Sequence, residues 1–203
     1  MLSFIFFLFF LGLSYLAGSI CSAVIVSDLC KLPDPRSTGS KNPGATNVLR
    51  LAGKKYAAIV LLTDILKGFL PVIIARMFSF EGFTLGCVAL AAVIGHLYPY
   101  FFEFKGGKGV ATALGTLFGI NFFLGLIITI LWILVALISK YSSLASIIAL
   151  LAAPLLSLKY HPSFTAFLPL LIMSFLVVYR HQANFVRLQN GTESKIDFGK
   201  KGL

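Results

Sequence analysis

Six apolar stretches, each about as long as a membrane-spanning helix, divide this chain and leave few folds open to it. They run over residues 3–26, 56–78, 83–102, 109–138, 142–158 and 163–180. About 20 apolar residues in an α-helix cross a hydrocarbon core about 30 Å thick. The chain is 58% hydrophobic and only 12% charged, so it cannot build the charged surface that a soluble domain needs. The sequence therefore predicts an all-α, polytopic bundle of transmembrane helices.

The fourth stretch, 109–138, is longer than one ordinary span needs. It carries Gly119 and Asn121 near its middle, and both residue types favour a helix less than apolar residues do. We therefore predict a break here, with a short helix over 109–118 and a full one over 122–138. The short helix crosses only if its neighbours shield it or thin the bilayer. Counting both, the chain has about seven spans.

Positive charge is distributed unevenly between the two ends of these spans. The chain has 17 Lys and Arg against 7 Asp and Glu, a net charge of +10. With the N-terminus outside, fourteen basic residues fall in inside loops, Arg76 and Lys159 fall outside, and Lys67 lies within a span. Cytoplasmic loops of membrane proteins are enriched in Lys and Arg, so we expect an N-out, C-in orientation. Without the break in the fourth stretch, Lys108 and Lys140 would lie on opposite sides.

Composition and spacing also exclude several classes of protein. No Lys or Arg precedes the apolar run in residues 1–26, so we interpret this run as a retained helix and not as a signal peptide. Cys21, Cys30 and Cys87 have no paired spacing, which argues against a disulfide framework and a zinc site. The aromatic residues lie in the spans and not among the basic residues, unlike those of nucleic-acid-binding proteins. We expect a single domain over residues 1–203 with no metal, no cofactor and no nucleic-acid partner.

The first inside loop, residues 31–50, is dense in Gly, Ser, Thr and Asn. Such a composition lets backbone N–H groups converge into a concave nest for anionic oxygens. A helix that begins near Ala45 would aim its positive N-terminal end at the same place, and Arg50 would offer two donors to a phosphate. The alternative is a solvated turn that only anchors the chain on the inside. The candidate binding residues of this loop are Gly39, Ser40, Asn42, Gly44, Thr46, Asn47 and Arg50.

The second inside loop places three glycines and two lysines at the start of the predicted short helix. It is not a Walker A sequence, but it combines the same elements: backbone donors, a Lys point charge and a helix N-terminus. A tight turn with two interfacial lysines is the alternative. His96 precedes the loop and is either a hydrogen-bonded structural histidine or a direct participant. The candidates here are His96, Lys105, Gly106, Gly107, Lys108 and Gly109.

Two further inside segments carry polar side chains. Ser143 and Ser146 are three residues apart and share one helix face, although the first of them could instead cap a helix. The end of the last span continues as a polar helix face. Its candidate substrate contacts are His181, Asn184 and Glu193.

Two charged residues, Asp64 and Lys67, lie within a predicted span and about one helical turn apart. Charged residues inside a membrane are rare and are usually paired with one another. We therefore favour an internal ion pair over a substrate contact.

Three of these segments resemble the signatures of a known enzyme family. Residues Gly39–Arg50 read GSKNPGATNVLR, residues Phe104–Thr112 read FKGGKGVAT, and the polar face at 180–193 supplies the third segment. Together and in this order, they resemble the signatures of bacterial acyl-phosphate:glycerol-3-phosphate acyltransferases, and the similarity covers nearly the whole chain. Lys41 departs from the pattern, because the family usually has Gly there and a side chain disfavours positive φ.

The resemblance implies transfer of a fatty acyl group from acyl phosphate to the 1-hydroxyl of glycerol 3-phosphate. The products are lysophosphatidic acid and inorganic phosphate, formed in a bacterial inner membrane by a site that faces the cytoplasm. It also implies contact with membrane lipid, and it makes the enzyme that produces acyl phosphate a candidate partner. Carried over residue by residue, it implies a catalytic set of Ser40, Arg50, Lys108, Ser143, Ser146, His181 and Asn184.

Acyl phosphate is already activated, since phosphate is a good leaving group, so the enzyme mainly orients the reactants and stabilises charge. We expect direct attack by the glycerol hydroxyl, without an acyl-enzyme. Its proton passes to the substrate's own phosphate, whose second pKa is about 6, or to His181. One alternative is a transporter of a phosphorylated metabolite, which needs access from both sides and often has internal repeats. The other is a scaffold that binds anionic lipids.

Overall fold

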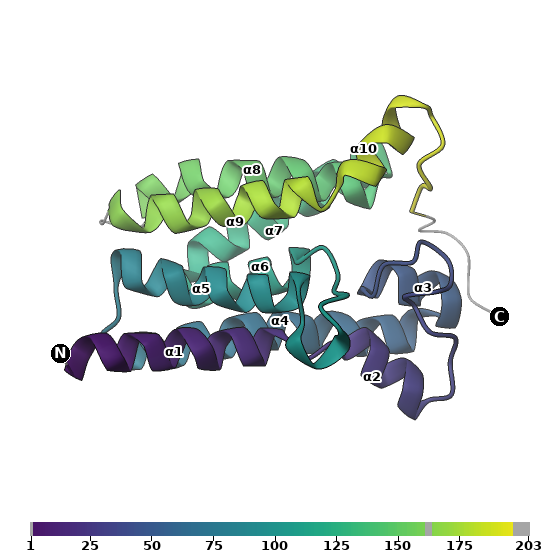
Figure 1. The fold of residues 1–203 in the computed structure, drawn as a ribbon. Coiled ribbons are helices and arrows are strands. Elements are labelled where there is room, and N and C mark those ends of the chain that lie inside the picture. The colour runs from purple at the N-terminus through teal and green to yellow at the C-terminus, as the bar shows by residue number, and fades with distance from the viewer. Residues whose placement is uncertain (1, 161–163, 197–203) are drawn as a thin grey trace.

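The computed structural model describes residues 2–160 and 164–196, and every regular element within these ranges is a helix (Figure 1). The start of the predicted span 163–180 lies outside these ranges, as do Lys200 and Lys201, two of the predicted inside cations. The helices are α1 (Leu2–Gly18), α2 (Ser22–Leu29), α3 (Ala45–Ala52), α4 (Lys54–Met77), α5 (Gly82–Leu97), η1 (Tyr100–Phe102), α6 (Val110–Ile120), α7 (Phe122–Ser139), α8 (Ser142–Tyr160), η2 (Phe164–Ala166), α9 (Phe167–Tyr179) and α10 (Gln182–Gln189).

The long helices form one bundle, with α1 and α4 on one side, α8 and α9 on the other, and α5, α6 and α7 between them (Figure 1). α6 packs against α4 and α5, α7 packs against α6 and α8, and α9 packs against α5 and α8. The short helices α2, α3 and α10 lie together at one end of the bundle (Figure 1). The polar segments singled out in the sequence therefore gather toward a single end.

Four helical segments are long and apolar enough to cross a membrane: α4, α5 with η1, α7 and α8. α1 and α2 qualify together as a fifth span, bent by 40°, while α6 and α9 are apolar but shorter. Every predicted apolar stretch thus contains a helix, whereas the count of seven spans and the N-out, C-in orientation stay predictions. The first stretch differs from the prediction, because 3–26 is two helices and not one.

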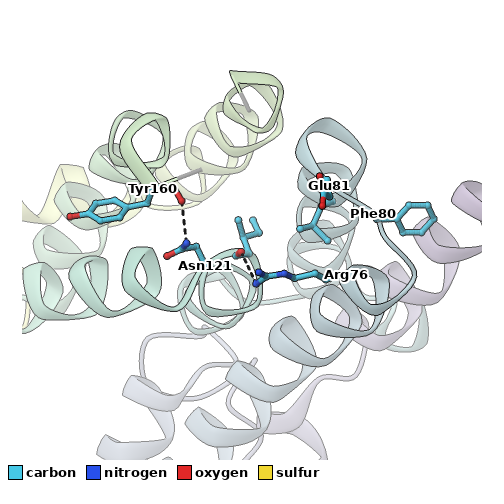
Figure 2. A pocket seen from close by; sticks show the side chains of 7 residues that line it. Arg76, Phe80, Glu81, Asn121 and Tyr160 are labelled. Atoms are coloured by element: carbon cyan, nitrogen blue, oxygen red, sulfur yellow. Dashed lines mark hydrogen bonds between the residues drawn. The ribbon is translucent and has the colours of Figure 1, made fainter. Parts of the chain in front are cut away.

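The predicted break in the fourth stretch is present, and it is stabilised by side chains. Asn121 separates α6 from α7, and its Oδ1 accepts a hydrogen bond from the backbone N–H of Leu124 at 3.1 Å. Its Nδ2 donates to the carbonyl oxygen of Tyr160 at 3.1 Å, and Arg76 reaches the carbonyl oxygen of Ile120 at 3.4 Å (Figure 2). These contacts satisfy backbone groups that the end of a helix leaves open.

The unpredicted bend between α1 and α2 is held by charged groups of α4. Lys67 Nζ donates to the carbonyl oxygen of Ile20 at 2.6 Å and pairs with Asp64 Oδ1 at 2.8 Å. Asp64 Oδ1 also accepts from Ser22 Oγ at 2.9 Å. An open carbonyl inside a bilayer needs such a donor, because no water is available. The predicted ion pair is confirmed, and it supports the bend.

Glycines allow the helices around α6 to approach closely. A Cβ added to Gly115 would overlap the carbonyl oxygen of Ile65, and one added to Gly68 would overlap that of Thr112. Small residues at helix contacts are typical of membrane bundles, where van der Waals packing replaces the hydrophobic driving force. This contact fixes α6 against α4.

We expect Gly115→Ala to lower stability by about 1–3 kcal/mol, because the added methyl group overpacks the α4–α6 contact. Gly12→Ala in α1 is the matched control, since a Cβ there meets nothing within 4 Å. Thermal unfolding in detergent measures both variants. Equal melting temperatures for the two would contradict the packing argument.

Candidate active site

The first polar loop, which is the predicted first inside loop at residues 31–50, is held in shape by Asn47, the third residue of α3. Its Oδ1 accepts from the backbone N–H of Ser40 at 2.9 Å, and its Nδ2 donates to the carbonyl oxygens of Pro35 and Thr38, both at 3.0 Å. Only 1% of Asn47 is exposed. Asn47 therefore holds the loop, and its amide is committed to the backbone and not to a ligand.

The same loop ends on an open helix terminus. α3 begins at Ala45, as the sequence predicts, and Gly44 precedes it without a side-chain cap. An uncapped N-terminus leaves N–H donors that favour an anion. Ser40 is exposed beside this loop, while Asn42 and Thr46 are half-buried. Position 39 requires glycine, because its φ is +64° and a Cβ there would overlap Asn47 Oδ1.

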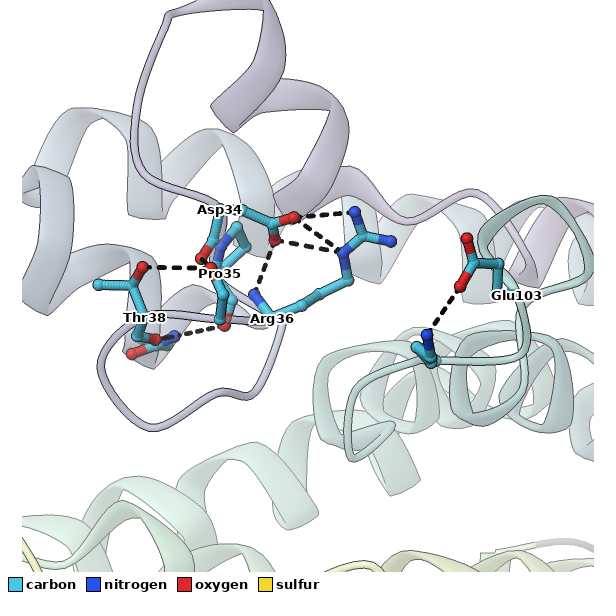
Figure 3. A network of polar contacts seen from close by, with 8 residues as sticks. Asp34, Pro35, Arg36, Thr38 and Glu103 are labelled. Carbon is cyan, nitrogen blue, oxygen red and sulfur yellow. Dashed lines mark hydrogen bonds and ion pairs between the residues drawn. The ribbon is translucent and has the colours of Figure 1, made fainter.

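An Asp–Pro–Arg turn near the start of this loop was not singled out in the sequence. Asp34 accepts from the backbone N–H of Arg36 at 2.8 Å and from its guanidinium at 2.8–3.2 Å (Figure 3). The hydrogen bond from N–H two residues on is typical of an Asx turn, so the spacing carried a usable signal. The contact holds the pKa of the Asp34 carboxyl below its usual value through the hydrogen bond from Arg36.

Arg180 binds the second polar loop, which is the predicted second inside loop and contains Lys105–Gly109. Its Nη2 donates to the carbonyl oxygen of Gly106 at 2.9 Å and its Nε to that of Gly107 at 3.3 Å. The guanidinium also lies 5.5 Å from the centre of the Tyr98 ring. Arg180 therefore fixes the loop and is more than an interfacial anchor. Gly109, with a φ of +85°, turns the chain into α6.

The third segment joins the second through a chain of hydrogen bonds centred on Glu193. Its Oε1 accepts from Ser143 Oγ and from Asn184 Nδ2, each at 2.7 Å, and its Oε2 accepts from Arg187 Nε at 2.7 Å. Asn184 Oδ1 in turn accepts from Lys108 Nζ. The structure thus brings Lys108, Ser143, Asn184 and Glu193 together from three separate parts of the chain.

The charge state of this cluster follows from its burial. Burial lowers the pKa of Lys108 to about 8; Glu193 opposes this shift, and Arg187 and Arg50 add to it. Burial opposes the charge of Glu193, but its hydrogen bonds from Ser143, Asn184 and Arg187 more than offset this effect and hold its pKa below the usual value. Lys108 is therefore a poorly solvated cation whose negative partner is already shared.

His181 lies beside the cluster as a neutral ring. Only 2% of the residue is exposed. Burial, reinforced by the charge of Lys108, lowers the pKa of His181 to about 4. Its Nδ1 lies 2.7 Å from the carbonyl oxygen of Val177, so in the neutral ring Nδ1 carries the proton and Nε2 keeps a lone pair. His181 is built to accept a hydrogen bond at Nε2.

Other predicted residues lie apart from this cluster. Ser146 Oγ donates to the carbonyl oxygen of Ser142 at 2.7 Å and accepts from Trp132 Nε1 at 3.0 Å. Lys105 forms an exposed ion pair with Glu103 at 2.7 Å (Figure 3). Of the two predicted serines, only Ser143 is hydrogen-bonded to Glu193. The contact of Trp132 with Ser146 was not predicted, because nothing in the sequence indicates that α7 packs against α8.

Arg50 approaches the cluster from α3. Its Nη2 donates to the carbonyl oxygen of Ser194 at 3.4 Å, next to Glu193. The same segment makes a second contact, in which the N–H of Ile196 donates to the carbonyl oxygen of Lys140 at 2.7 Å. The segment after α10 therefore bridges the first polar loop and the α7–α8 turn. Among residues 2–160 and 164–196, no three His, Cys, Asp or Glu side chains are placed to hold a metal ion.

Lys41 keeps a left-handed backbone despite its side chain, with a φ of +56°. This conformation costs a non-glycine residue about 1–2 kcal/mol. We expect Lys41→Gly to be neutral or to stabilise the protein by up to about 1 kcal/mol, because glycine removes the strain but adds freedom to the unfolded chain. Lys31, with a φ of +54°, offers a matched Lys→Gly control outside the site. A lower melting temperature for Lys41→Gly alone would assign its side chain a structural contact.

Known proteins match this chain over almost its full length. A family model described as "Glycerol-3-phosphate acyltransferase" matches residues 8–191. A glycerol-3-phosphate acyltransferase of Legionella pneumophila (strain Lens) is 52% identical, over 95% of this chain and 70% of its own length. One from Francisella tularensis subsp. holarctica (strain OSU18) is 50% identical, over 90% and 89%. The crystal structure of PlsY, an integral membrane glycerol 3-phosphate acyltransferase, in its glycerol 3-phosphate form has a TM-score of 0.89 and 40% identity, over 94% of this chain and 96% of that one. This chain therefore belongs to the glycerol-3-phosphate acyltransferase family.

Proposed function

We propose that this protein transfers a fatty acyl group from acyl phosphate to the 1-hydroxyl of glycerol 3-phosphate, releasing lysophosphatidic acid and inorganic phosphate. The reaction takes place at the cytoplasmic face of a bacterial inner membrane. The observation that carries the proposal is the hydrogen-bonded cluster of Lys108, Asn184, Glu193 and Ser143, with Arg50 reaching the same segment. An enzyme that makes acyl phosphate is the partner that must supply this reaction.

Both substrates carry phosphate, and the site is rich in cations suited to it. Lys108 is half-buried, and a charge attracts an anion more strongly where the surroundings are less polar. Arg50 stands on α3, whose uncapped N-terminus favours an anion at the same end of the loop. Donors fixed before the substrate arrives stabilise developing charge without having to reorganise.

The two serines are unsuited to forming an acyl-enzyme. A serine nucleophile needs a neighbouring base. Ser143 donates to Glu193, whose pKa is held low by its hydrogen bonds, so that carboxylate is a weak base. Ser146 donates to a backbone carbonyl oxygen. We therefore propose that the glycerol oxygen attacks the acyl carbon directly, and that the bond from this carbon to the phosphate oxygen breaks.

The hydroxyl proton goes to the phosphate of glycerol 3-phosphate. A proton acceptor works best when its pKa lies near the working pH. The second pKa of a phosphate ester is about 6, whereas the pKa of His181 is about 4. The phosphate of free glycerol 3-phosphate is thus a stronger base than His181. His181 instead accepts a hydrogen bond at Nε2 and orients the hydroxyl.

The transporter alternative receives no support from the arrangement of the polar groups. A carrier binds its cargo near the midplane and opens to both sides. Here the short helices and polar segments gather at one end of the bundle (Figure 1). We therefore keep the transporter only as an outcome of the test.

Purified wild-type protein in detergent, given acyl phosphate and glycerol 3-phosphate, is expected to form lysophosphatidic acid and phosphate. Arg50→Ala and Lys108→Ala should each lose most of this turnover and keep their helical circular dichroism, because each removes a cation from a phosphate. Mass spectrometry of the product is the measurement. No product from the wild type, together with glycerol 3-phosphate uptake into sealed liposomes, would favour the transporter.

The dependence of kcat/KM on pH is expected to show two limbs. It should fall as pH drops through about 6, where the substrate phosphate becomes protonated and can no longer take the proton. It should also fall as pH rises through about 8, where Lys108 loses its charge. Lys108→Arg should remove the alkaline limb, because an arginine stays charged throughout.

His181→Gln is the control for the acid limb. The limb near pH 6 should remain in this variant, since it belongs to the substrate and not to the ring. An acid limb near pH 4 that disappears in His181→Gln would instead make His181 the proton acceptor.

A further inference from the structure

A buried polar cluster lies beneath the two polar loops, outside the groups that the proposed reaction uses. Asp64 and Lys67 on α4 are 2% and 7% exposed, and their ion pair is 2.8 Å long. His96 at the end of α5 is 5% exposed, and its Nδ1 lies 3.7 Å from Asp64 Oδ1. That distance is too long for a hydrogen bond, and among the described residues Nδ1 has no other partner.

His96 also touches the second polar loop on its other side. Its carbonyl oxygen accepts a hydrogen bond from the backbone N–H of Gly107 at 3.1 Å. A Cβ added to Gly107 would overlap His96 Nε2 and would lie 3.0 Å from the carbonyl oxygen of Pro43. Gly107 is therefore enclosed between the imidazole and the first polar loop. It directly precedes Lys108.

The ion pair reaches the first polar loop by a second route. Lys67 donates to the carbonyl oxygen of Ile20 and Asp64 accepts from Ser22, which fixes the bend where α2 begins. α2 leads directly into the first polar loop. The ion pair on α4 therefore lies against the bend before the first polar loop and against His96 before the second.

The carbonyl oxygen of Ile20 accounts for the donor of Lys67, but stability gives a poor reason for the two paired charges and for His96 beside them. Replacing a buried ion pair with apolar residues is often neutral or stabilising, because removing two charges from water costs about as much as their attraction returns. An unpaired imidazole nitrogen adds a further cost. A buried polar group without a partner therefore calls for an explanation.

We propose that Asp64, Lys67 and His96 are positioning residues for the acyl transfer. The carboxylate of Asp64 limits the position of the imidazole by close approach, at 3.7 Å from Nδ1. The imidazole in turn limits the position of Gly107, and Gly107 sets that of Lys108. The inference rests on the proposed function, since its readout is the handling of glycerol 3-phosphate. Small displacements of a positioned group carry a large kinetic effect.

The test uses Asp64→Asn combined with Lys67→Met, which removes both charges at once and leaves neither buried without a partner. We expect a lower melting temperature, because Lys67→Met leaves the carbonyl oxygen of Ile20 without its donor. The folded variant should show a KM for glycerol 3-phosphate raised about tenfold and a kcat that changes much less. A purely structural pair predicts that a stable double variant also has a normal KM, and this result would overturn the proposal.

His96→Gln tests the route through the imidazole. Alone it should raise KM by the same factor, and added to the double variant it should raise KM no further, because residues that act through one contact are not additive. Full additivity, or a normal KM in His96→Gln, would overturn the proposal. This single variant also carries the test if the double variant fails to fold.

Ser14→Ala is the matched control. Ser14 is buried on α1 and donates to the carbonyl oxygen of Val88 at 2.7 Å, about two turns of α5 below His96. It should lower the melting temperature at most, without changing KM. The wild type is assayed first, so a wild type that makes no lysophosphatidic acid counts against the proposed function, whereas unchanged kinetics in the variants counts against the positioning role.

Discussion

Wherever a helix stops inside an apolar bundle, its open backbone groups must find partners within the protein, because lipid offers none. This constraint explains the polar side chains found at two breaks in the helices. Lys67 satisfies the carbonyl of Ile20 at the α1–α2 bend, and Asn121 serves the start of α7 at the next break. The breaks in turn let polar loops reach into one end of the bundle. The placement of the site therefore depends on how these helix ends are satisfied.

A second consequence concerns the charges that meet at this end. Four segments converge there, and Arg50, Lys108 and Arg187 bring cations that would repel one another without an anion between them. Glu193 supplies that anion and binds Ser143, Asn184 and Arg187 at once. Because its charge is shared among several donors, Lys108 still has capacity for a phosphate. The cluster is thus held together without being neutralised.

The sequence predicted those features that depend on local pattern. The length of the fourth apolar stretch and its Gly and Asn located the α6–α7 break, and the Gly-rich composition located the start of α3 at Ala45. It failed where the deciding contact is distant. The α1–α2 bend was missed because hydropathy averages over 3–26, while its support comes from Lys67 on another helix. Likewise, their spacing of three residues could not show which of Ser143 and Ser146 joins the cluster. Their partners, Glu193 and Trp132, lie elsewhere in the chain.

The short length of α6 ties the fold to the chemistry. Its 11 residues span about 16 Å, roughly half of a hydrocarbon core about 30 Å thick. A helix of that length cannot bring both of its ends to the two membrane surfaces. One end is met by Arg76 and Asn121, and the other begins at Gly109, directly after Lys108. In the second polar loop, which leads into this end, Gly106 and Gly107 are buried and Lys108 is half-buried. Burial within this loop lowers the pKa of Lys108, so the start of α6 and the charge of the lysine are set together.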